Sequence, residues 1–263
     1  MRSIIYRTVQ VTGNSVTFAF LHQSRPRILG QGTSVRPRDT DPTQYQLNPK
    51  TFLYPSLWAH VRNLSIFDQR TENALRVLEL CPNLEDVGIW LLDGDPTPIK
   101  RVLRTLAYLK RVSWDPLSLQ TPSTTPTNEE PTIPKIINSC IHFDEKLFRN
   151  VTHLKLSNDG NATQWSWPRW ESLAHLPKLT HLAIYLPIPE DFARSILIRC
   201  SQLRVFALIY VEPCGTPTWL LNDTIDDSRL VIIYSGFADV KEQWASTALA
   251  HRGEFWETAE SKS

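Results

Sequence analysis

One apolar spacing recurs along most of this 263-residue sequence. An apolar residue is followed by two variable residues, a second apolar residue, one variable residue and a third apolar residue. CPNLEDVGIW (81–90) shows the spacing with Leu84, Val87 and Ile89; six full copies and one degenerate copy begin at residues 61, 84, 109, 151, 179, 203 and 230. Five of the six intervals are 23 to 28 residues long, a period typical of repeat proteins with one short strand per copy.

The remaining interval, 42 residues long, contains a stretch rich in Pro, Ser and Thr. Such a composition buries too little apolar surface to fold, so we interpret residues 115–135 as a disordered insertion in an ordinary repeat. Thr71 and Thr97 are expected as N-caps of helices. Four segments between the predicted strands have helical apolar spacing: 71–80, 97–109, 189–200 and a shorter one at 167–176. Strand, loop and helix at a constant period predict an α/β leucine-rich-repeat solenoid of about six to seven repeats, with a curved parallel sheet on the concave face and helices on the convex face.

We expect three regions. They are a partly strand-like N-terminal segment with a flexible basic loop (1–50), the repeat domain (51–238), and a C-terminal capping helix and tail (239–263). FLYPSLWAHVRNL (52–64) and QWASTALAHRGEFWETAE (243–260) resemble the F-box/leucine-rich-repeat-like proteins of mushroom-forming fungi. The resemblance implies that the repeats recognise a substrate protein for a ubiquitin ligase. Residues 1–50 have no counterpart of the helical F-box that docks the ligase adaptor in that family, so a stand-alone repeat scaffold without a ligase link is the alternative.

The charge balance argues against two classes of partner. Twenty-eight Lys and Arg residues face 27 Asp and Glu residues, so no overall field attracts nucleic acid or an anionic membrane. No run approaches the roughly 20 apolar residues of a membrane-spanning helix, and the first residues do not form a secretory signal. We therefore expect an intracellular protein, cytoplasmic or nuclear, without a nucleic-acid or membrane partner.

The residues that could carry chemistry fit structural roles better. Cys81 and Cys200 occupy the same place before a repeat strand, which favours packing over nucleophilic catalysis. Acidic pairs stand beside turn-forming residues, which predicts backbone roles for Asp93, Asp95, Asp226 and Asp227. The sequence contains no nucleophile-elbow, phosphate-loop or dinucleotide motif, so we expect no enzyme activity, no cofactor and no metal. The four cysteines lie far apart, which is typical of free thiols: Cys81, Cys140, Cys200 and Cys214.

Two histidines hold the same position in neighbouring copies. VTHLKL places His153 and LTHLAI places His181 where adjacent strands would bring them side by side, about 4.8 Å apart. A two-histidine metal site is conceivable. The matching position of the next copy is Val205, which offers no third ligand, so surface or interface histidines are the favoured interpretation.

Two further clusters leave alternatives open. The cluster RPRILGQGTSVRPR carries four arginines without interleaved aromatic residues, which favours a solvated loop over a phosphate or nucleic-acid site: Arg25, Arg27, Arg36 and Arg38. WSWPRW (165–170) fits either an exposed binding hot spot or a packed helix start.

Strand alternation predicts where a partner binds. If the repeated apolar residues point into the core, their neighbours point onto the concave face, which solenoids use to bind extended partners. The expected partner-binding residues are Phe67, Asp86, Trp90, Arg111, His153, Lys155, His181 and Tyr185. In the sixth copy this face is apolar (Val205, Ala207, Ile209), so the C-terminal segment is expected to cover it. The sequence thus predicts a monomeric, non-enzymatic protein-binding module for an unknown protein partner.

Overall fold

The computed structural model describes residues 6–12, 15–20, 27–29, 58–114, 141, 143, 145–156, 165–185, 187–211, 218–222, 224–235 and 252–262. The chain folds into two compact units. Unit 1 comprises Met1–Val112 and Lys241–Phe255, and unit 2 comprises Ser113–Val240 and Trp256–Ser263. The insertion expected at 115–135 lies outside the described residues, and the region boundaries at 50 and 238 stay predictions.

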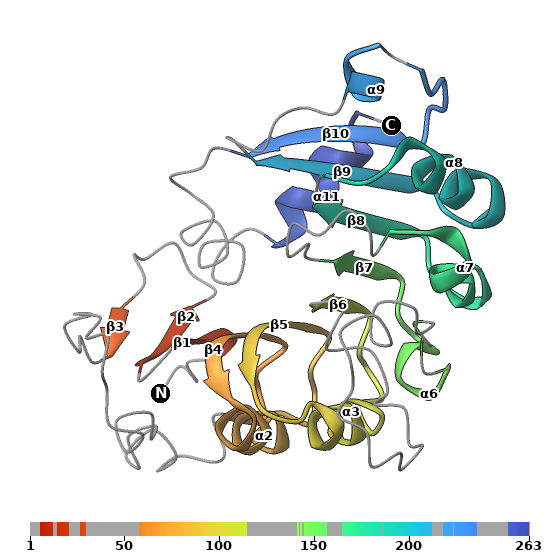
Figure 1. The fold of residues 1–263 in the computed structure, drawn as a ribbon. Helices are drawn as coiled ribbons and strands as arrows, with labels where there is room; N and C mark the ends of the chain where they lie inside the picture. The colour runs from red at the N-terminus through yellow and green to blue at the C-terminus, as the bar shows by residue number, and fades with distance from the viewer. Residues whose placement is uncertain are drawn as a thin grey trace, which may run out of the picture. The chain divides into compact units, whose positions relative to one another are not determined.

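Unit 1 combines an antiparallel start with parallel strands. Its elements are β1 (Tyr6–Thr12), β2 (Ser15–Phe20), β3 (Arg27–Leu29), β4 (Asn63–Arg70), α2 (Thr71–Leu80), β5 (Asp86–Asp93) and α3 (Thr97–Leu103). The strand order is β3-β2-β1-β4-β5. The pairs β2–β3 and β1–β2 are antiparallel, whereas β1–β4 and β4–β5 are parallel. Figure 1 shows α2 and α3 together on one side of β4 and β5.

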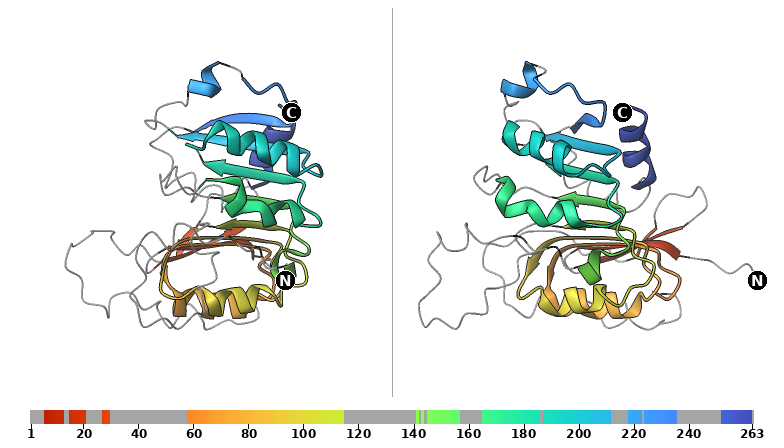
Figure 2. Two further views of the ribbon diagram at one scale, coloured as in Figure 1. Left: turned by 45° about the vertical axis from the view of Figure 1, so that its right-hand side comes forward. Right: turned by 90° about the vertical axis from the view of Figure 1, so that its right-hand side faces the viewer.

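In unit 2, strands that follow each other in sequence lie side by side. Its strands are β7 (His153–Leu156), β8 (His181–Tyr185), β9 (Val205–Val211) and β10 (Leu230–Ser235), and each pairs in parallel with the next. The helices are α6 (Glu145–Phe148), α7 (Trp167–Trp170), the 3-10 helix η4 (Glu171–His175), α8 (Glu190–Arg199) and α9 (Thr218–Leu221). β6 (Arg111–Trp114) and α11 (Arg252–Glu260) each span the boundary between the units. Figure 2 shows α7 and α8 on one face of β8 and β9, with α11 on the opposite face.

The repeated apolar residues form the core, as the spacing predicts. Leu64 pairs with Val87 and Ile66 with Ile89 between β4 and β5, and all four are fully buried. The same holds in unit 2 for Leu154, Leu182 and Phe206 at one level and Leu156, Ile184 and Leu208 at the next. The protein is therefore α/β with mostly parallel strands, as expected. The seventh copy starts earlier than the spacing suggested, because Leu230 pairs with Phe206 and so occupies the second apolar position.

A backbone pattern recurs at the start of the strands. In four places two successive N–H groups donate to a single carbonyl oxygen of the preceding copy, at 2.8 to 3.2 Å. The carbonyls belong to Arg62, Glu85, Thr152 and Thr180, and the donors stand 23 to 29 residues further on. An amide side chain makes an equivalent link twice: Asn83 Nδ2 donates to Ala59 O and Gln202 Nε2 to Leu176 O. At these strand starts, one copy thus satisfies carbonyl groups of the copy before it.

The expected N-caps are wrong in both helices. Thr71 and Thr97 are the first residues inside α2 and α3, after Arg70 and Pro96 at the cap positions. β4 runs directly into α2, so the Thr71 hydroxyl donates instead to Asp93 O at 3.1 Å, which links the helix start to the end of β5. The helix predicted over 97–109 also ends early, at Leu103.

Candidate functional site

The eight expected partner-binding residues do not form one open surface. Half of them are partly exposed: Phe67, Arg111, His153 and Lys155. The expected exposure is wrong for the other half, which are at most 7% exposed: Asp86, Trp90, His181 and Tyr185. Strand alternation correctly turns these side chains away from the repeated apolar core, but their side of the strands is itself partly buried.

In unit 1 the buried carboxylate of Asp86 lies near the guanidinium group of Arg111. Asp86 opens β5, and its side chain is 5% exposed, with Oδ2 lying 3.9 Å from Arg111 Nη1. Arg111 opens β6 and is 38% exposed. A desolvated carboxylate is costly unless a cation or donors compensate it, so this contact explains why an acidic residue is tolerated there. Trp90, further along β5, buries its indole to 5% exposure, which contributes apolar area on this face.

In unit 2 the two histidines meet as their register predicts. His153 pairs with His181 across β7 and β8, and the ring centroids lie 4.1 Å apart with an angle of 7° between planes. The rings are therefore stacked face to face. Val205 occupies the next position across β9, so the ladder of histidines ends there.

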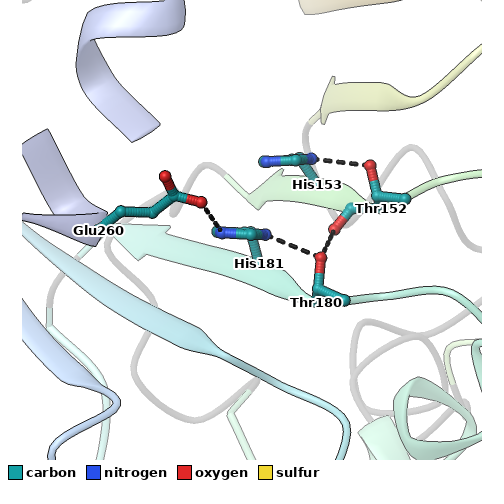
Figure 3. Close-up of polar contacts among 5 residues, drawn as sticks. All are labelled: Thr152, His153, Thr180, His181 and Glu260. Atoms are coloured by element: carbon teal, nitrogen blue, oxygen red, sulfur yellow. Dashed lines mark hydrogen bonds and ion pairs between the residues drawn. The ribbon is translucent and has the colours of Figure 1, made fainter. Parts of the chain in front are cut away.

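A threonine before each histidine sets the ring orientation. Thr152 Oγ1 lies 2.8 Å from His153 Nδ1, and Thr180 Oγ1 lies 2.8 Å from His181 Nδ1. Thr180 Oγ1 also donates to Thr152 O at 3.2 Å, which ties the two strands together. Figure 3 shows both rings held at their Nδ1 edge, with the opposite edge of His181 directed at Glu260. The Thr-His pair thus recurs as a unit in the two copies.

The C-terminal helix covers this pair. Glu260 Oε1 lies 2.9 Å from His181 Nε2, and the glutamate side chain is 48% exposed whereas the imidazole is 4% exposed. The Trp256 ring stands nearly perpendicular to both imidazole rings, with centroid distances of 5.0 Å to His153 and 5.6 Å to His181. Trp256 and Ala259 are buried, and together with Glu260 they lie on one face of α11.

This cover is the feature that sequence reasoning missed. The sequence predicts the C-terminal segment over Val205, Ala207 and Ile209, and these three residues are indeed buried. The contacts of Trp256 reach further, to the histidines of the two preceding strands. The available signals were the repeated Thr-His pair and the spacing of an aromatic residue and a carboxylate four positions apart in FWETAE.

Beside the pair, Lys155 and Tyr185 form a second contact between β7 and β8. Lys155 Nζ lies 5.2 Å from the centroid of the Tyr185 ring, within the range of a cation–π interaction. Burial raises the pKa of the Tyr185 hydroxyl above its usual range. The Tyr185 ring is an aromatic platform for the ammonium group, and its burial favours the neutral phenol even at alkaline pH.

The geometry of the histidines does not suit a shared metal ion. Stacked rings direct their equivalent nitrogens along parallel lines, whereas two ligands of one ion must converge on it. Among the described residues, no group of three His, Cys, Asp or Glu side chains is arranged to hold a metal. The two rings contact α11 of the same chain, so the interpretation as surface or interface histidines stays a prediction.

The two described cysteines are packed. Cys81 and Cys200 form the C-caps of α2 and α8 and are fully buried. Burial raises the pKa of each thiol to about 12, so the nucleophilic thiolate is strongly disfavoured at neutral pH. Cys140 and Cys214 lie outside the described residues.

The remaining clusters have structural contacts. Hydrogen bonds from the Thr97 hydroxyl and from Thr97 N lower the pKa of the Asp95 carboxyl. Hydrogen bonds from the Arg229 guanidinium and backbone lower the pKa of the Asp227 carboxyl. Trp165 and Trp170 are buried and stacked, with centroids 4.5 Å apart, which favours packing over a hot spot for WSWPRW. Of the arginine cluster, Arg25, Arg36 and Arg38 lie outside the described residues, and Arg27 begins β3.

The fold and these contacts define an α/β protein with mostly parallel strands and a covered histidine pair. Neither the protein-family models nor the curated proteins include a match to this chain. Among the described residues, none of the helices combines the length and apolar character needed to cross a membrane.

Proposed function

We propose that this protein is a leucine-rich-repeat solenoid that acts as a non-enzymatic protein-binding module. The observation that carries the proposal is the repeated strand start, in which two N–H groups donate to one carbonyl of the preceding copy. The bonds recur at four strand starts with the period of the apolar spacing, which supports a repeat in which one copy stacks on the next. Within each unit, stacked copies of this kind present in-register rows of side chains, which suit an extended partner.

The side chains opposite the core give this row its chemistry. Each unit has its own row: the partly exposed members are Phe67 and Arg111 in unit 1, and His153 and Lys155 in unit 2. Aromatic and basic groups are enriched in protein interfaces, where aromatic rings supply contact area and cations supply orientation. We expect the partner to contribute acidic and apolar side chains.

A site-specific photo-crosslinker tests the proposal. The crosslinking amino acid is placed at Lys155 on β7, and in a matched variant at Ile198, which is 74% exposed on α8. A discrete crosslinked protein is expected from position 155 and not from position 198. Identical products from both positions would contradict binding through the strand face.

The same samples test the link to ubiquitin ligation that the family resemblance implies. Recovery of a cullin-ligase adaptor with the full chain would support a role as the substrate-recognition part of an F-box-type ligase. A crosslinked partner without any adaptor would favour the stand-alone repeat scaffold.

A further inference from the structure

α11 packs on the histidine pair as a short helical ligand packs on a preformed binding site. The receiving side consists of His153 and His181, held by strand pairing and by the hydroxyls of Thr152 and Thr180. None of these anchors comes from α11, so the rings keep their orientation when the helix leaves. A preorganised site binds with less loss of conformational entropy than one that must form on contact.

α11, which takes the place of the ligand, is a short helix with few buried residues. α11 has nine residues, and isolated helices shorter than about 12 to 15 residues are marginal in water. Its buried contacts come from Trp256 and Ala259, with Glu260 at the edge. Glu257 and Thr258 are exposed. One aromatic ring and one carboxylate of α11, four residues apart on one helical face, thus contact the histidines.

Trp256 and Glu260 contribute to the contact in different ways. The Trp256 ring packs nearly perpendicular to both imidazoles and supplies a large aromatic contact surface. The Glu260 carboxylate meets His181 Nε2 at 2.9 Å at the half-exposed rim, where charged contacts give orientation more than affinity. A helix with another aromatic residue and a carboxylate at this spacing offers the same two contacts.

We propose that the His153–His181 face is a binding site for a short partner helix that carries a tryptophan and, four residues later, a carboxylate, and that α11 occupies this site until such a helix displaces it. The inference rests on the proposed function, because it names the class of protein ligand. Under this proposal, α11 and the partner helix cannot occupy the His153–His181 face at the same time. Since α11 is tethered, its effective concentration is on the order of millimolar, and a free helix at micromolar concentration competes poorly.

A labelled peptide of residues 250–263 tests this with the full-length chain. Its binding is measured by fluorescence anisotropy to the unmodified chain and to the double variant Trp256→Ala, Glu260→Gln, in which the tethered helix is weakened. We expect at least tenfold tighter binding to the double variant. Adding His181→Ala to that variant, or replacing the tryptophan of the peptide by alanine, should abolish the gain. Glu257→Gln, an exposed change on the same helix, is the matched control and should leave binding at the unmodified level.

Three outcomes would overturn the proposal. They are equal binding to the unmodified chain and the double variant, binding that ignores the peptide tryptophan, and a concentration-dependent dimer of the unmodified chain that Trp256→Ala dissolves. The last would identify a second copy as the occupant. If the double variant is unfolded, as judged by loss of its far-UV circular dichroism, the single variant Glu260→Gln replaces it in the assay. We then expect a peptide affinity between that of the unmodified chain and that expected of the double variant. The assay needs no natural partner, so peptide binding together with failed crosslinking at Lys155 would remove the proposed function and leave this site standing.

Discussion

Replacing Trp90 by alanine measures how completely the non-core side of β5 is buried. The indole is 5% exposed, so nearly all of its surface is removed from water. Tryptophan buries about 200 Å², and at about 25 cal/mol per Å² this corresponds to about 5 kcal/mol. The figure is an upper estimate because denatured chains already bury some apolar surface, and measured truncations of buried aromatics cost about 3 to 5 kcal/mol. We expect a loss in this range, which is a large part of the roughly 5 to 15 kcal/mol typical of a folded protein.

Urea unfolding followed by far-UV circular dichroism measures the loss as a fall in the midpoint at unchanged slope. Ile198→Ala in α8 is the control, because that side chain is 74% exposed and its truncation should change the free energy of unfolding by less than about 0.5 kcal/mol. Trp90→Phe keeps most of the ring volume and should lie between the two. If Trp90→Ala lowers the free energy of unfolding by less than about 1 kcal/mol, the indole is not buried. It would then be exposed, as strand alternation predicted.

Three further predictions concern single positions. Gly94 has φ of +110°, and a Cβ there would lie 2.9 Å from a threonine hydroxyl oxygen, so Gly94→Ala should cost about 1 to 3 kcal/mol in thermal unfolding; an unchanged midpoint would contradict this conformation. Cys81 and Cys200, with pKa raised to about 12, should resist iodoacetamide at pH 8 until urea unfolds the chain, as peptide mass spectrometry would show; rapid labelling of the folded protein would contradict their burial. Hydrogen bonds from Arg229 lower the pKa of Asp227, so its stabilising contribution is present above the unfolded value near 3.9 and is lost as pH falls through the folded value; Asp227→Asn should remove that part of the acid dependence of the urea midpoint, by less than about 1 kcal/mol because the pair is partly exposed.

Much of the fold follows from the apolar spacing. Leu84, Val87 and Ile89 are fully buried, as are the residues at the second and third apolar positions of the full copies in unit 2. This succeeds because the alternation of a strand depends only on local backbone geometry. Helix ends were less predictable: the start of α2 depends on Thr71 donating to Asp93, a contact between elements 22 residues apart.

The candidate site was predicted only in part. The side-by-side placement of His153 and His181 follows from their common register, and the structure confirms it. Their cover does not follow from the register, because it involves Glu260, 79 positions beyond His181. No local pattern in VTHLKL or LTHLAI specifies which distant segment packs above them.

By itself, the sequence determined which side of each repeated strand enters the core, since a period of two residues assigns alternate side chains to opposite faces. Only the tertiary structure decided which of the opposite side chains remain in contact with water. Lys155 and Arg111 stay half-exposed, whereas His181 and Trp90 are buried. The physical reason is that the second face of a sheet is covered by segments far away in the chain, and burial there depends on their packing and not on the strand's own spacing.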